Sequence, residues 1–149
     1  MSQVKFTIVE CIGSGALAEV GHFLKQEWAA LDRERWGNES PQWHKTCHWL
    51  RAEHDGQTVG AARFYFRGGV AHLSEIVVGQ PWRGQGIGRR LMARFEEMAR
   101  RAGCHKLSLR TLEGSPSVRF YQRLGYKVEG KLSRHYHQLT FLQLGKFLT

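Results

Sequence analysis

The chain has 149 residues, 42% hydrophobic and 23% charged, which excludes general disorder and suits one domain, expected to cover residues 1–149. The net charge of +9 is compatible with a polyanionic partner, either a nucleic acid or a ligand with several phosphates. No apolar run approaches the roughly 20 residues of a membrane span, and no secretory signal is visible, so we expect a cytoplasmic protein without membrane partners.

The first part of the chain is expected to contain a strand and one amphipathic helix. Residues 4–10 form the strand, and the glycines at residues 13 and 15 end it. Helical spacing then places five apolar residues on one face: Leu17, Val20, Leu24, Trp28 and Leu31. Ser14 is the candidate N-cap of this helix, and residues 32–41 are expected to be irregular.

Three strands are expected next, at residues 49–54, 58–66 and 70–78. The Asp55-Gly56 pair predicts a two-residue hairpin between the first two, so the three strands form an antiparallel meander. An amphipathic helix follows, and its apolar stripe recurs at helical spacing: Ile87, Leu91, Phe95, Met98 and Ala102.

The last part of the chain is expected to hold three more strands and a short helix. A strand at residues 106–111 returns parallel to residues 70–78, because a strand–helix–strand order requires a crossover. A short helix from Ser115 to Leu124 and closing strands at residues 126–128 and 137–144 complete the order. The fold class is therefore α/β, with a mostly antiparallel sheet, one parallel pair formed by the fourth and fifth expected strands, and flanking helices.

The turn before the amphipathic helix carries glycine at alternate positions. Such a turn exposes the unpaired N–H groups of the helix N-terminus, which favour an anion such as a phosphate. The alternative is a tight turn that needs glycine for its backbone conformation. The spacing matches neither the dinucleotide fingerprint nor the P-loop. The turn and the first helical residues are Arg83, Gly84, Gln85, Gly86, Ile87, Gly88 and Arg89.

Arg83, Gly86 and Gly88 resemble the Gln/Arg-x-x-Gly-x-Gly/Ala signature of the GCN5-related N-acetyltransferases. A second stretch, from Phe120 and Tyr121 to Gly125 and Tyr126, resembles the aromatic segment of the same family, and the order of elements is similar over essentially the whole chain. Two positions depart from the family pattern, where Gly114 replaces an asparagine and Ser117 replaces an alanine.

The resemblance implies that acetyl-CoA is the co-substrate. No metal is expected, because no second set of ligands at zinc spacing accompanies His44, Cys47 and His48. Backbone groups freed where the two parallel strands part would pair with the pantetheine arm: Ile76, Val77 and Val78. The N–H of Val77 or Val78 would stabilise the oxyanion, and the N–H groups from Gly84 to Arg89 would hold the pyrophosphate. Ser117 is expected to join the cofactor site.

The implied chemistry is transfer of an acetyl group to a primary amine by direct attack in a ternary complex. Glu75 and His72 are the candidate bases, and strict alternation places them on opposite faces of their strand unless a bulge intervenes. Tyr121 is the candidate acid for the thiolate, or a hydrogen-bond donor to the sulfur. A different function on the same fold, acyl-CoA sensing or nucleic-acid binding without catalysis, stays open.

The acceptor is a small-molecule amine or the amine of a peptide or protein, and the sequence does not choose between them. Nucleic acid is not the expected partner, because the basic residues are scattered along the chain. A homodimer formed through the closing strands stays open. Four tryptophans are expected to pack in the core or in a lid, the alternative being an aromatic wall for the acceptor: Trp28, Trp36, Trp43 and Trp49.

Overall fold

The computed structural model describes residues 4–5, 7–39 and 43–148. The chain divides into two compact units, residues 1–41 and residues 42–149, and each is described by itself. Within the described residues no helix has both the length and the apolar character that crossing a membrane requires.

The described part of the first unit contains the helix α1 (Ser14–Trp36) and the short 3-10 turn η1 (Gly37–Glu39). The helix extends through residues 32–36, expected to be irregular, because none of these five residues is glycine or proline, and it ends at Gly37, whose φ is 60°. Gly13 occupies the cap position, so Ser14 is the first helical residue and not the N-cap. The described residues between 4 and 10 form no strand, and that prediction is wrong for them.

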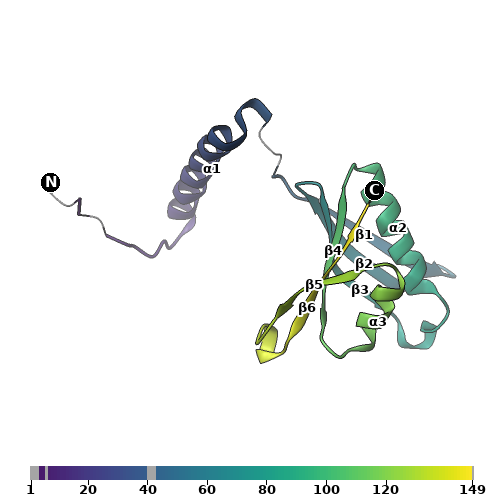
Figure 1. The fold of residues 1–149 in the computed structure, drawn as a ribbon. Coiled ribbons are helices and arrows are strands. Elements are labelled where there is room, and N and C mark those ends of the chain that lie inside the picture. The colour runs from purple at the N-terminus through teal and green to yellow at the C-terminus, as the bar shows by residue number, and fades with distance from the viewer. Residues whose placement is uncertain (1–3, 6, 40–42, 149) are drawn as a thin grey trace. The chain divides into compact units, whose positions relative to one another are not determined.

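The second unit is a sheet with helices on one face (Figure 1). Its regular elements are β1 (Thr46–His54), β2 (Gln57–Arg67), β3 (Val70–Val78), η2 (Gln80–Trp82), α2 (Ile87–Arg101), β4 (Lys106–Leu112), α3 (Pro116–Arg123), β5 (Lys127–Leu132), η3 (Tyr136–Gln138) and β6 (Phe141–Phe147). The Asp55-Gly56 hairpin is confirmed, and both residues have positive φ, as a tight two-residue turn between twisted strands requires.

The six strands lie in the order β1-β2-β3-β4-β6-β5. All neighbouring pairs are antiparallel except β3 and β4, which are parallel. The expected fold class is confirmed, and the parallel pair consists of the expected segments. Among the described residues they are the third and fourth strands, because residues 4–5 and 7–10 form no strand.

The core lies on the face of the sheet that α2 covers. Leu91, Met92, Phe95 and Ala99 of α2 are buried there against fully buried side chains of the strands, which include Phe64 and Leu144. Tyr121 of α3 belongs to the same buried cluster, so both α-helices of this unit cover the same face. The opposite face carries the polar residues of β2, β3, β4 and β6, and no α-helix of residues 43–148 covers it.

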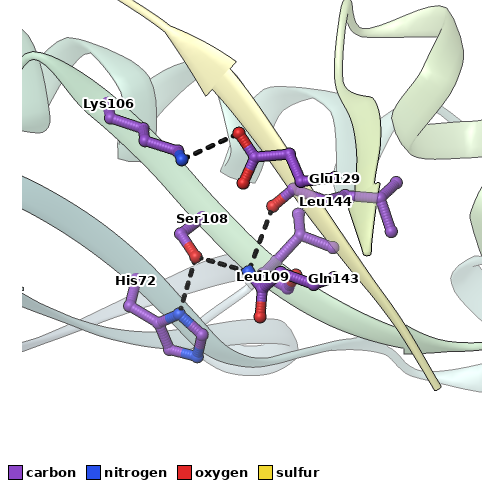
Figure 2. A network of polar contacts seen from close by, with 7 residues as sticks. All are labelled: His72, Lys106, Ser108, Leu109, Glu129, Gln143 and Leu144. Carbon is purple, nitrogen blue, oxygen red and sulfur yellow. Dashed lines mark hydrogen bonds and ion pairs between the residues drawn. The ribbon is translucent and has the colours of Figure 1, made fainter. Parts of the chain in front are cut away.

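β6 begins at Phe141 and not at residue 137, as expected, because Tyr136–Gln138 form the turn η3. β5 is longer than the expected strand at residues 126–128, because a bulge lets it continue along β6. The register between them shifts from Val128 to Gly130, which leaves Glu129 as the extra residue. Its carboxylate lies 2.7 Å from Nζ of Lys106 on β4 (Figure 2). Gly145 makes room for this pair, since a Cβ there would lie 2.5 Å from the carboxylate of Glu129.

Candidate active site

The strands β3 and β4 separate partway along their length. Their parallel pairing ends at Leu73 and Leu109, whereas β3 continues to Val78 and β4 to Leu112. Beyond Leu73, β3 stays paired with β2 on its other side. One edge of β3 therefore presents backbone groups that no described strand pairs, and such groups need a partner or water. This free edge contains the residues expected to meet the pantetheine arm: Ile76, Val77 and Val78.

The glycine-rich turn leaves the N-terminus of α2 open. Gly84 and Gly86 have φ of 77° and 83°, so glycine is required at both positions, and no heavy atom lies within 4 Å of a Cβ built on either. Gly86 is the N-cap of α2, no side chain caps the helix, and its first turn holds no acidic residue. The first N–H groups of α2 therefore remain available to an anion.

The free edge of β3 and the open end of α2 line one cavity of about 860 Å³, which is in the range of small-molecule sites. This cavity includes ten of the predicted cofactor residues: Ile76, Val77, Val78, Arg83, Gly84, Gly86, Ile87, Gly88, Arg89 and Ser117. Gln85 is the exception, because it lines a separate cavity of about 520 Å³ beside Arg90 and Arg94.

Three further residues line the larger cavity without having been predicted: Trp82, Phe120 and Arg123. Phe120 and Arg123 flank Tyr121 in the aromatic segment, so their place in that segment was the available signal. Trp82 follows a proline in the 3-10 turn η2, and no sequence pattern marked it. Arg123 adds a third arginine to the cavity beside Arg83 and Arg89, which suits a ligand with several negative charges.

Tyr121 of α3 lines the same cavity and is 7% exposed. Its ring lies edge-on to those of Phe120 and Tyr126, with centroids 5.2 and 5.8 Å away. Burial raises the pKa of the Tyr121 phenol above its ordinary value, so the phenol is protonated at neutral pH and able to donate. The structure shows no hydrogen bond from this hydroxyl to another described residue, which leaves it free for a ligand.

A bulge in β3 brings Glu75 to the face that carries His72. The register against β2 passes from Glu75 opposite Arg63 to Leu73 opposite Phe64, so Ser74 is the extra residue. Strict alternation would have placed Glu75 and His72 on opposite faces. After the bulge, Glu75 shares the face opposite α2 with His72.

The side chain of Glu75 is 68% exposed and forms an ion pair with Arg63, at 2.9 Å between Oε1 and Nη2. Neither Glu75 nor His72 lines the 860 Å³ cavity. Val77 does line it, and its register opposite Ala61 places it on the face of Glu75. The cavity therefore lies along the separated edge of β3, and the two candidate bases lie near the same edge on the face of the sheet opposite α2.

His72 belongs to a chain of polar contacts that crosses from β3 to β4 and β6 (Figure 2). Its Nδ1 lies 3.2 Å from Oγ of Ser108, which also receives a hydrogen bond of 2.7 Å from the amide nitrogen of Gln143. Burial lowers the pKa of His72 below 6.5, and the positive charges of Arg110 and Lys45 lower it further. The imidazole is therefore neutral at neutral pH.

Within residues 43–148, Trp43 and Trp49 do not join the core, since they are 47% and 67% exposed, and the expectation of core packing is wrong for both in this unit. Trp49 lies opposite Arg63 in the register of β1 and β2, which places it on the same face as Glu75. An exposed tryptophan on that face agrees with the alternative of an aromatic surface for the acceptor.

Comparison with known proteins matches residues 17–126 to the family model described as the acetyltransferase (GNAT) family. A glucosamine 6-phosphate N-acetyltransferase from Trypanosoma brucei brucei is 33% identical over 59% of this chain and 60% of its own length. An aminoalkylphosphonate N-acetyltransferase from Salmonella typhimurium is 37% identical over 54% of this chain and 56% of its own length. The chain thus spans little more than half the length of these curated relatives.

Two solved structures have the same fold. An acetyltransferase from Bacillus cereus superposes with a TM-score of 0.74 at 18% identity and covers 95% of this chain and 98% of its own. An acetyltransferase from Bacillus subtilis, solved in complex with CoA, superposes with a TM-score of 0.65 at 16% identity and covers 69% of this chain and 78% of its own.

Proposed function

Because the chain belongs to the acetyltransferase (GNAT) family, we propose that it transfers an acetyl group from acetyl-CoA to a primary amine. The observation that carries this proposal is the cavity in which the free edge of β3, the open N-terminus of α2 and the hydroxyl-bearing Tyr121 come together. The family match begins inside α1 and ends at Tyr126, which supports the expectation that residues 1–149 act as one domain.

In this proposal the pantetheine arm pairs with the free edge of β3 as an additional strand would. The N–H of Val77 or Val78 then points at the thioester oxygen, where it stabilises the negative charge of the tetrahedral intermediate. The pyrophosphate lies on the first N–H groups of α2, and the arginines that line the cavity neutralise the remaining phosphate charge.

The amine attacks the thioester carbon directly, so no covalent intermediate on the protein is needed. An alkylammonium has a pKa of about 10.4, so it must lose a proton before it can attack. Glu75 and His72, both on the face opposite α2, are the candidate acceptors of this proton, directly or through water. As the carbon–sulfur bond breaks, Tyr121 donates to the departing sulfur from inside the cavity.

The acceptor is proposed to be a small amine. Two curated relatives act, by their names, on glucosamine 6-phosphate and on aminoalkylphosphonates, which are small molecules that carry an amine and a phosphorus-based anion. The basic charge of this chain is compatible with such acceptors. Phosphorylated amines therefore belong in the first acceptor screen, beside amino acids and peptides.

The test combines binding with turnover. We expect acetyl-CoA to raise the melting temperature of the protein, and an amine panel to release free CoA thiol. The matched variant is Gly88→Glu, because this position has ordinary helical φ and would place a carboxylate at the proposed pyrophosphate site. The variant should fold and lose the thermal shift. A shift without thiol release for any amine would identify an acyl-CoA-sensing module, and no shift at saturating acetyl-CoA would refute the proposal.

A further inference from the structure

We propose that Lys45, His72 and Arg110 form a subsite, on the face of the sheet opposite α2, that binds an anionic group of the acceptor amine. The inference rests on the proposed acetyl transfer and names its substrate class, which is a primary amine that also carries a phosphate, phosphonate or carboxylate. In this subsite His72 acts as a hydrogen-bond donor and not as the base.

The orientation of the Gln143 amide is the first step. Its Oε1 lies 3.0 Å from Nε of Arg110, and a guanidinium group only donates, so oxygen must occupy that position. The other end of the amide lies 3.2 Å from the carbonyl oxygen of Leu109, which only accepts. The two neighbours therefore agree that the amide nitrogen of Gln143 points at Ser108 (Figure 2).

The tautomer of His72 follows from that orientation. Ser108 Oγ accepts the hydrogen bond from Gln143, so its own hydrogen remains to be placed. Ser108 is only 9% exposed, and among the described residues Nδ1 of His72 is the acceptor within reach of this hydrogen. A neutral imidazole that accepts at Nδ1 carries its hydrogen on Nε2. His72 in this state presents a donor, and Nε2 cannot take a proton from an ammonium group.

The charges around His72 indicate which kind of ligand group its Nε2–H would bind. Nζ of Lys45 lies 4.0 Å from the ring centroid of Tyr65, and the Tyr65 ring lies 5.1 Å from that of His72. Arg110 is held on the other side through Gln143. No carboxylate of the described residues forms an ion pair with Lys45 or Arg110, whereas Arg63 on the same face is paired with Glu75. Two cations without a counterion and a neutral N–H between them match an oxyanion.

The position of the subsite in the sheet suits the binding of an acceptor amine. His72 and Ser108 are register partners one step before the pairing of β3 and β4 ends, so the subsite lies where the two strands separate. The free edge with Val77 continues from that point. An amine anchored by its anion at His72 can extend along β3 toward the thioester, and the polar face of the sheet, not the cofactor cavity, holds it.

The kinetic test uses three primary amines of equal chain length that end in a phosphate, a carboxylate or an uncharged hydroxyl group. We expect KM for the anionic amines to be lower, and Lys45→Met to raise it by about tenfold to a hundredfold, as the loss of a charge-assisted hydrogen bond does, without changing KM for the uncharged amine. Arg101→Gln, which removes one exposed charge at the end of α2, should leave KM unchanged for the anionic amines and for the uncharged amine. Equal KM for all three amines would overturn the subsite, and a difference between the phosphate and the carboxylate identifies the anion.

Two substitutions of His72 distinguish a hydrogen-bond donor to the anionic group from a general base for the amine. The amide nitrogen of glutamine can take the place of Nε2, whereas that of asparagine can take only the place of Nδ1. We expect KM for the anionic amine to be about tenfold higher in His72→Asn than in His72→Gln, with similar kcat in the two variants. A large fall in kcat for both variants, with KM unchanged, would show that His72 is the base and overturn the assignment.

A second measurement does not depend on turnover. In proton–nitrogen correlation spectra the His72 ring should show the Nε2–H tautomer, and titration with inorganic phosphate should shift its signals in the wild type and much less in Lys45→Met. The Nδ1–H tautomer, or no response to phosphate, would refute the subsite. Absence of thiol release with every amine would refute acetyl transfer and still leave this binding result to decide the subsite.

Discussion

Nε of Arg83 donates a hydrogen bond of 3.0 Å to the carbonyl oxygen of Val78, the last residue of β3. This contact joins the glycine-rich turn to the strand with the free edge, so one guanidinium links the two parts of the proposed cofactor site. Because Nε makes the contact, the terminal nitrogens of the guanidinium remain for a phosphate.

Arg83→Lys is therefore expected to weaken acetyl-CoA binding although it keeps the charge. Lysine cannot make the Nε contact and a phosphate contact at the same time, so we expect Kd, measured by calorimetry, to rise about tenfold. The matched control is Arg89→Lys, at a lining arginine that makes no hydrogen bond to β3, and its Kd for acetyl-CoA should rise less. Equal losses in both variants would mean that Arg83 contributes only charge.

Gly88→Ala is expected to separate folding from binding. The backbone at Gly88 is helical, and a Cβ there would meet the ring of Phe120 at 3.5 Å, an ordinary contact. Alanine lowers the entropy of the unfolded chain, so the free protein should melt about 2–4 °C higher. If the pyrophosphate lies on the first turn of α2 as proposed, the added methyl group would crowd it, so the thermal shift caused by acetyl-CoA should shrink. An unchanged shift would place the pyrophosphate elsewhere.

Tyr121→Phe is expected to lower kcat by about a hundredfold with little change in KM for acetyl-CoA, as the loss of a proton donor to the leaving group does. The melting temperature should stay within about 2 °C, because the hydroxyl makes no hydrogen bond to a described residue and the ring packing is kept. Steady-state thiol release and a melting curve on the same preparation test both statements. An unchanged kcat would leave Tyr121 with a packing role alone.

The sequence predicted the elements around the proposed cofactor cavity more accurately than those around the proposed acceptor subsite. β3 has the predicted bounds, and the glycines at 84, 86 and 88 lie where the resemblance placed them, because glycine and β-branched residues act locally. The bulge at Ser74 was not readable, because an extra residue is defined only against the register of the partner strand. That single residue decides which face Glu75 occupies.

The same limit applies to the contacts of His72. Ser108 and Gln143 lie 36 and 71 residues beyond His72 in the numbering, and only the order β3-β4-β6 brings the three together. Likewise, the pairing of β3 and β4 ends at Leu73, three residues before Ile76, the first residue expected where the strands part. Local patterns predict strands, whereas the point at which two strands part depends on how each packs on its other side.

Glu75→Gln and Arg63→Gln form a matched pair that tests the remaining candidate base. Their ion pair is exposed and contributes at most about 1 kcal/mol, so both variants should melt close to the wild type. If Glu75 accepts the proton, Glu75→Gln lowers kcat about a hundredfold, whereas Arg63→Gln keeps the carboxylate and most of the activity. Thiol release at saturating substrates measures both. Equal activities in the two variants would leave proton acceptance to water.

The pH dependence of stability should reveal the environment of His72. Its pKa in the folded protein is below 6.5, so at acidic pH the unfolded chain binds a proton at this residue that the folded chain does not. The contribution of neutral His72 is therefore complete above about pH 6.5 and is lost as pH falls through the lower, folded pKa. Between about pH 8 and about pH 5, the wild type should lose more stability than His72→Gln, which has no such proton. Denaturant unfolding of both proteins across this range measures the difference. Inorganic phosphate should reduce this difference between the two proteins, because an anion bound at the subsite favours the imidazolium form of His72. Identical pH profiles of the two proteins without phosphate would contradict the lowered pKa of His72.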